Sequence, residues 1–128
     1  MNLLIDTHVV IWSVTNGHQI PPVVKEQLEN TDNVCHVSMA SLWEMSIKHS
    51  LGRLDLHAPL ADIFRIIEDS GFELLPIMPA HILCNATLAY HHQDPFDRLI
   101  IAQALCEDMT IVSKDGMFDS YGVPLFWK

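Results

Sequence analysis

The fold is decided by the opening stretch Asn2-Leu3-Leu4-Ile5-Asp6-Thr7, in which a short apolar run ends at an acid and a hydroxyl. A continuous apolar run of this kind is typical of a strand that is covered on both faces. Asp or Thr at its end can cap a following helix. A second run, Met109-Thr110-Ile111-Val112, also leads into polar residues, Ser113-Lys114-Asp115. The two runs predict strands that carry polar groups at their carboxyl ends.

Apolar runs and helical patterns alternate along the rest of the chain. The predicted strands are residues 2–5, 33–37, 72–75, 109–112 and 124–127. The predicted helices begin at Asp6-Thr7 and at Pro21-Pro22, and then span residues 38–50, 59–69, 79–90 and 94–107. Joined by right-handed crossovers, these elements predict one α/β domain over residues 1–128, a three-layer α/β/α sandwich with a central parallel sheet. Ligands of such sheets bind outside the carboxyl ends of the strands.

Composition narrows the function. Asp and Glu number 16 against 7 Lys and Arg, a net charge of −9, which argues against binding nucleic acid by bulk positive charge. A hydrophobic content of 49% excludes disorder, and the longest apolar runs are far short of the ~20 residues of a membrane span. No signal peptide is apparent. The scattered residues Cys35, Cys84 and Cys106 predict reduced thiols in the cytoplasm rather than a zinc site.

Acidic residues occur where the predicted sheet would place a ligand. Asp6 and Asp115 follow strands, Glu44 lies on the helix that follows the second strand, and Asp97 lies in the first turn of the 94–107 helix. Each acid alone has a structural interpretation that the sequence leaves open. These are a helix cap at Asp6, a capping box at Ser41-Leu42-Trp43-Glu44, a helix start at Asp94-Pro95-Phe96-Asp97 and a turn at Asp115-Gly116.

If these acids converge, they need a cation. Two like charges ~4 Å apart repel by ~4 kcal/mol at an effective dielectric of ~20. Hard oxygen ligands with no His or Cys in register favour Mg²⁺ or Mn²⁺ over zinc. Such an ion can activate water and neutralise the charge that builds on a phosphodiester, so the cluster predicts in-line phosphodiester hydrolysis.

Four blocks of sequence match a known family. They are Leu3-Leu4-Ile5-Asp6-Thr7-His8, Ser38-x-x-Ser41-x-Trp43-Glu44-x-x-x-Lys48, Asp94-Pro95-Phe96-Asp97-Arg98 running into Ile101-Ala102-Gln103-Ala104, and Ile111-Val112-Ser113-x-Asp115-x-x-Phe118. Together they resemble a PIN-domain ribonuclease of the VapC toxin type. The third block is the most specific, and the resemblance covers essentially the whole chain.

The resemblance implies a set of roles. Asp6, Glu44, Asp97 and Asp115 correspond to the family's catalytic and metal-binding acids, and the implied cofactor is Mg²⁺ or Mn²⁺. Thr7, Ser38 and Ser113 resemble polar neighbours of the acids that are able to hydrogen-bond the carboxylates or metal-bound water, and Asp94 is a helix cap first and an outer ligand second. The implied partners are an RNA substrate, a cognate antitoxin and a second copy of the chain in a homodimer.

Basic residues close to the acids have two interpretations each. Lys48, Arg98 and Lys114 are candidates for binding RNA phosphates. Alternatively, Lys48 pairs with Glu44 at i,i+4, and Arg98 pairs with Asp94 or Asp97. The adjacent residues His91-His92 favour exposed imidazoles over ligands.

The sequence therefore predicts a metal-dependent endoribonuclease that acts as a toxin. Two other functions remain open: a PIN-like binding or regulatory module that does not cleave, and a metal-dependent nuclease acting on DNA.

Overall fold

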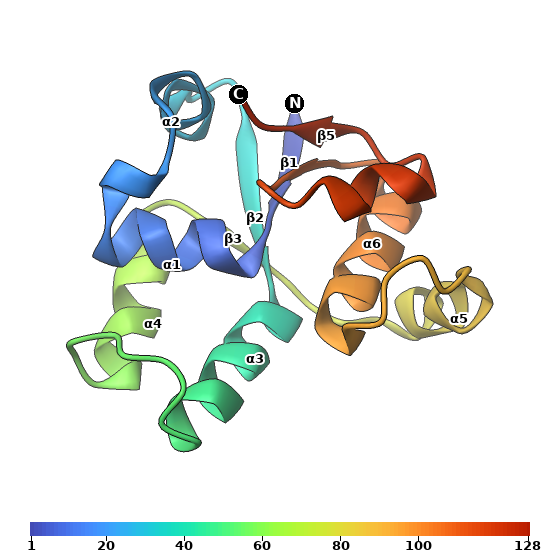
Figure 1. Cartoon of the computed structure of the whole chain (residues 1–128). Coiled ribbons are helices and arrows are strands. Elements are labelled where there is room, and N and C mark those ends of the chain that lie inside the picture. The colour runs from blue at the N-terminus through green and yellow to red at the C-terminus, as the bar shows by residue number, and fades with distance from the viewer.

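The computed structural model describes residues 1–128 and has a five-stranded parallel sheet at its centre (Figure 1). Its strands are β1 (Asn2–Ile5), β2 (Val34–Ser38), β3 (Glu73–Leu75), β4 (Thr110–Val112) and β5 (Leu125–Phe126). Their order across the sheet is β3-β2-β1-β4-β5, and every neighbouring pair is parallel. The predicted α/β class with a central parallel sheet is confirmed, and the opening stretch forms its middle strand.

Helices cover both faces of the sheet. They are α1 (Thr7–Thr15), α2 (Pro22–Glu29), α3 (Met39–Ser50), α4 (Leu60–Asp69), α5 (Pro79–Thr87) and α6 (Pro95–Glu107), with the short 3-10 helices η1 (Gly17–Gln19) and η2 (Gly116–Tyr121). In Figure 1, α1, α3 and α4 lie to one side of the strands and α5 and α6 to the other. No helix combines the length and the apolar character that a membrane crossing requires.

Alternating residues of the strands belong to two separate apolar cores, one on each face of the sheet. Leu3 and Ile5 of β1 pack with residues of α1, α2, α3 and α4, whereas Leu4 packs with residues of α6 and η2. The same alternation separates Val112 from Ile111 in β4. Because successive side chains of a strand point to opposite faces, a continuous apolar run is what a sheet covered on both faces requires.

Two predicted elements are shorter in the structure by two residues or more. The helix that begins at Pro79 ends at Thr87, not at residue 90. Just beyond it, the carbonyls of Leu88 and Ala89 accept hydrogen bonds from the Arg98 guanidinium instead of from helical N–H groups. The last strand is Leu125–Phe126 only. Proline has no backbone N–H to donate to the ladder, and Pro124 contributes only its carbonyl, which accepts from the Ile111 N–H.

Candidate active site

The carboxyl ends of the central strands meet at one edge of the sheet, and Asp6 lies there directly after β1. The residue is 5% exposed. Asp6 occupies the N-cap position of α1, but its carboxylate makes no capping hydrogen bond. Instead Oδ2 accepts a hydrogen bond of 3.0 Å from Ser113 Oγ, and the buried Oδ1 has no partner. Asp6 is therefore the N-cap residue of α1 by position, as predicted, but its carboxylate does not cap the helix.

Burial and a second acid work against ionisation of Asp6. Burial raises its pKa above the usual value, and the negative charge of Glu44 adds to the rise. His8, with Nδ1 3.9 Å from Asp6 Oδ2, and the Ser113 hydrogen bond lower the pKa but do not cancel the effect of burial. A cation bound nearby would favour the ionised form of this carboxyl.

Glu44 lies on α3 and is 2% exposed. The cap of α3 is Ser38, whose Oγ accepts from the Ala40 N–H, so Glu44 is inside the helix and the capping-box interpretation is wrong. Lys48 Nζ donates to Glu44 Oε2 at 2.6 Å, which confirms the i,i+4 pair, and this hydrogen bond is the main reason that the pKa of Lys48 is raised. Glu44 Oε1 is buried without a partner.

Asp97, in the first turn of α6, is the electrostatic centre of the cluster. Burial is the largest cause of its raised pKa, which is about 8 instead of 3.8. The negative charges that add to this rise are those of Asp6, Asp94, Glu44 and Asp115. The structure thus brings four other carboxylates within electrostatic reach of Asp97: two that follow strands, Asp6 and Asp115, and two from helical segments, Glu44 of α3 and the α6 cap Asp94.

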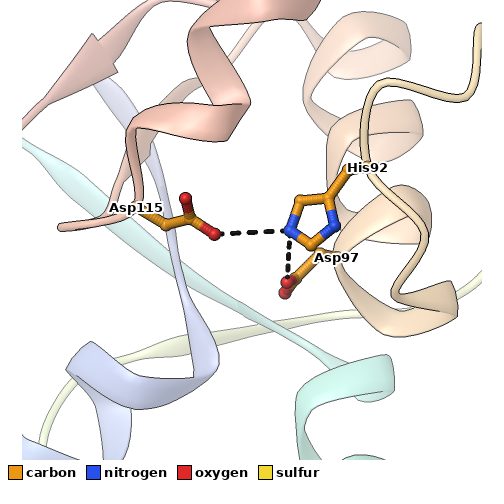
Figure 2. A group of neighbouring side chains, drawn as sticks. All are labelled: His92, Asp97 and Asp115. Atoms are coloured by element: carbon orange, nitrogen blue, oxygen red, sulfur yellow. Dashed lines mark hydrogen bonds and ion pairs between the residues drawn. The ribbon is translucent and has the colours of Figure 1, made fainter.

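His92 completes the cluster, and sequence reasoning had set it aside. Its Nε2 lies 2.9 Å from Asp97 Oδ2 and 3.3 Å from Asp115 Oδ2 (Figure 2). The side chain is 16% exposed, so the expectation of an exposed imidazole is wrong. The expectation that no His lies in register with the acids is wrong as well. No local sequence pattern predicts this contact, because it depends on how the segment before α6 folds.

The predicted supporting residues separate into two groups. Asp94 caps α6 by accepting from the Phe96 and Asp97 N–H groups, and Ser113 donates to Asp6 as described. Thr7 Oγ1 donates to Ser41 Oγ, and Ser38 Oγ donates to Gln103 Oε1, so neither hydroxyl donates to an acid of the cluster. Both are buried and tie neighbouring elements together.

Arg98 is neither a phosphate ligand nor an ion-pair partner of the acids. It is 5% exposed, and its guanidinium stacks 3.9 Å from the centre of the Tyr90 ring. Its four hydrogen bonds, of 2.8–3.3 Å, go to the backbone carbonyls of Asn85, Leu88, Ala89 and His92. Both sequence interpretations of Arg98 are therefore wrong. The segment before α6 folds over the residue and supplies backbone carbonyls as hydrogen-bond acceptors, which no local sequence pattern predicts.

A depression borders the acidic cluster on the α1 and α3 side. Its lining includes Glu44 and Thr7 together with Lys48, Arg53 and Trp12. Lys114, on the loop after β4, is exposed. Cationic groups therefore lie beside the acids rather than among them, apart from Lys48.

The donor set suits a hard divalent cation. Carboxylate oxygens are the ligands that Mg²⁺ and Mn²⁺ prefer, and two of them, Asp6 Oδ1 and Glu44 Oε1, are buried with no hydrogen-bond donor. Ligand atoms of His92, Asp97 and Asp115 also lie within 4.8 Å of one another. An unpartnered buried polar atom is costly, and a bound cation is a simple way to satisfy such an oxygen.

Solved structures share the whole architecture. VapBC2 from Rickettsia felis bound to a DNA fragment from their promoter has a TM-score of 0.76 at 18% identity over 100% of both chains. DNA-bound VapBC from Salmonella typhimurium has a TM-score of 0.71 at 19% identity, covering 98% of this chain and 97% of that one. VapBC-5 from Mycobacterium tuberculosis, a member of the VapBC family of toxin–antitoxin systems, has 0.56 at 18%, covering 99% and 98%.

At these identities the likeness concerns the fold. No curated protein sequence matches the chain. The model of the PIN domain, a family whose members are generally nucleases, matches residues 3–124, and the chain therefore belongs to the PIN-domain family.

Proposed function

We propose that the chain is a metal-dependent endoribonuclease and the toxin of a toxin–antitoxin pair. The observation that carries the proposal is the carboxylate cluster around Asp97, in which burial and, after it, the like charges raise the pKa of Asp97 to about 8, while two buried oxygens lack any donor. A merely structural cluster would be destabilising, whereas a cluster that binds a cation is stabilised whenever the cation is present.

Asp6, Glu44, Asp97 and Asp115 would hold Mg²⁺ or Mn²⁺, with Asp94 as an outer group. When bound, such a cation supplies charge neutralisation for a phosphodiester and lowers the pKa of water. The protein itself fixes the carboxylates. Ser113 orients Asp6 through its 3.0 Å hydrogen bond, and Lys48 orients Glu44 through its 2.6 Å hydrogen bond.

RNA is the proposed substrate. Lys48 and Arg53 line the depression that Glu44 borders, and Lys114 is exposed after β4, so phosphates of a strand entering the site would meet positive charge on its margin. Arg98 has no part in this role, because its guanidinium is committed to backbone carbonyls.

The proposed partners are a cognate antitoxin and a second copy of the chain, in the cytoplasm. Structures of VapBC complexes support the antitoxin by analogy. Large apolar side chains are exposed on α5 and just after it, at Ile82, Leu83 and Tyr90, as expected if other chains cover them. Light scattering of the purified chain, alone and co-expressed with the product of the adjacent gene, tests both partners.

The decisive assay is cleavage of matched RNA and DNA oligonucleotides by the purified protein in Mg²⁺, in Mn²⁺ and in EDTA. We expect RNA cleavage that EDTA abolishes, that Asp6→Asn and Asp97→Asn reduce by at least about 10²-fold, and that the exposed-surface control Asp119→Asn leaves intact. Cleavage of DNA alone would identify the DNA nuclease, and no cleavage with either cation would favour the binding module. Full activity of both Asn variants would refute the assigned roles.

A further inference from the structure

His92 is held between two acids of the cluster by its own segment of chain. Its backbone N–H donates to Tyr121 Oη at 2.8 Å, and its carbonyl accepts from Arg98 Nη1 at 3.3 Å. Tyr121 Oη in turn donates to Ala89 O at 2.8 Å. The segment between α5 and α6 is thus fastened at several backbone groups, and the ring that it presents is positioned rather than free.

The position of the imidazole proton follows from the contacts of the ring. The Asp94 N–H donates to His92 Nδ1 at 3.3 Å, so Nδ1 is an acceptor. A neutral imidazole has one acceptor nitrogen and one N–H. The proton therefore sits on Nε2, the nitrogen that faces Asp97 Oδ2 and Asp115 Oδ2 (Figure 2). A protonated nitrogen has no lone pair for a metal, so in this arrangement Nε2 donates its hydrogen bond to Asp115 Oδ2 and lies in close polar contact, at 2.9 Å, with Asp97 Oδ2.

The contacts leave other oxygens free for a cation. His92 Nε2 contacts Oδ2 of Asp97 and donates to Oδ2 of Asp115. Asp115 Oδ1 accepts from the Met117 N–H. No protein group donates to Asp97 Oδ1. Asp6 Oδ1 and Glu44 Oε1 are also unpartnered, each on a side chain that is more than nine-tenths buried. These oxygens are therefore available to a cation while the imidazole keeps its contacts with Asp97 and Asp115.

We propose that His92 is a positioning residue of the cation site: its Nε2–H donates to Asp115 and the same nitrogen contacts Asp97, so the ring keeps the two carboxylates side by side and leaves the remaining oxygens to bind the ion. The inference rests on the proposed function, since it presumes that the cluster binds a divalent cation. The proposal adds to the site a residue that is not an acid. It also explains the contacts of Arg98 and Tyr121 with the backbone of His92, which fix the segment that carries the ring. Groups that hydrogen-bond metal ligands typically contribute 10–100-fold to metal affinity.

The test uses Mn²⁺ as the probe and intact protein. His92→Phe keeps a ring but removes the donor, His92→Gln keeps a side-chain N–H, and His91→Phe is the matched control at the neighbouring position. We expect His92→Phe to weaken Mn²⁺ binding, measured by calorimetry and by the signal of free Mn²⁺, by about 10–100-fold. His92→Gln recovers part of that loss and His91→Phe shows none, at equal urea midpoints. A loss of fold alone would not give this rescue.

A spectroscopic measurement on the wild-type protein decides whether the imidazole is a ligand, without any substitution. Electron spin-echo modulation of bound Mn²⁺ detects a directly bonded ¹⁴N, and labelling with ¹⁵N-histidine identifies it. We expect no directly bonded histidine nitrogen. Direct bonding of His92, unchanged affinity in His92→Phe, or tighter binding in His92→Phe would each overturn the proposal while leaving the metal-dependent function intact. Absence of Mn²⁺ binding by the wild-type protein would instead overturn both.

Discussion

Replacing Asp97 by Asn should make the cation-free protein more stable, although it removes a side chain at the centre of the candidate site. Asp97 lies among carboxylates from α1, α3, α6 and the loop after β4. The substitution keeps the size of the side chain and removes its negative charge. Burial and the neighbouring charges both disfavour the ionised form of Asp97. In wild type, folding must therefore either protonate this carboxyl or bury its charge, and the Asn variant avoids that free-energy cost.

The magnitude follows from the pKa of Asp97. A folded value of about 8 against 3.8 in the unfolded chain corresponds to about 4 kcal/mol at pH 7, at 1.36 kcal/mol per unit. The side chain is 18% exposed, and small movements of the carboxylates would relieve some repulsion. We therefore expect Asp97→Asn to raise the free energy of unfolding by about 2–4 kcal/mol at neutral pH.

The sign of the pH dependence is fixed by the direction of the shift. Between pH 3.8 and about 8, the folded protein binds more protons at Asp97 than the unfolded chain does, so this residue makes stability fall as pH rises. The advantage of the Asn variant should be small near pH 4, grow through this window and level off above about pH 8.

Urea unfolding in EDTA, followed by circular dichroism at several pH values between about 4.5 and 8.5, measures this difference. Asp119→Asn, at an exposed acid of η2, is the control and should stay within about 0.5 kcal/mol of wild type. Adding Mg²⁺ should stabilise wild type more than Asp97→Asn. A variant that is no more stable than wild type at pH 7.5, or a gain that does not change with pH, would refute the idea that these carboxylates repel one another.

Three other substitutions probe the supports of the site, each measured as a urea midpoint. Lys48→Met leaves Glu44 Oε2 buried without a donor, so we expect a loss of about 1–3 kcal/mol in EDTA and a larger stabilisation by Mg²⁺ than in wild type; equal stabilisation would contradict this. Arg98→Met orphans the backbone carbonyls before α6 and should cost about 2–4 kcal/mol, whereas a surface Arg would cost almost nothing. Gln103→Leu should cost about 1–3 kcal/mol, and a neutral result would mean that its hydrogen bonds to Ser38 and Pro76 contribute nothing net.

The sheet could be predicted from sequence because the information is local. The apolar run Leu3-Leu4-Ile5 must be buried on both faces of the sheet, and the same holds for the run that contains Ile111. These few residues therefore predict two central strands and a layer of helices on each face. The acids at the strand ends were predictable for the same reason. In a parallel sheet the position after a strand fixes the edge on which a side chain lies.

His92 and Arg98 were not predictable in the same way, because each depends on how the segment before α6 folds. For Arg98 one signal existed: Ile101 and Ala102 stand three and four positions after it, on the same side of the helix, and both are buried. That periodicity places the guanidinium inside. It does not say which acceptors would meet it, since these are carbonyls from a segment whose path the sequence leaves open.

The helices that carry Glu44 and Asp97 bring like charges together, so something must hold them in place when no cation is bound. Ser38, at the start of α3, donates to Gln103 of α6 at 2.5 Å, and Gln103 Nε2 donates to the carbonyl of Pro76 after β3. Both side chains are fully buried. The resemblance to PIN ribonucleases implied that Ser38 would hydrogen-bond the acids, yet in the structure it ties the two helices beneath them. The hydrogen bonds from Ser38 to Gln103 and from Gln103 to Pro76 therefore oppose the electrostatic repulsion between the two helices. The acidic site is unfavourable on its own, and it persists because the packing around it is favourable.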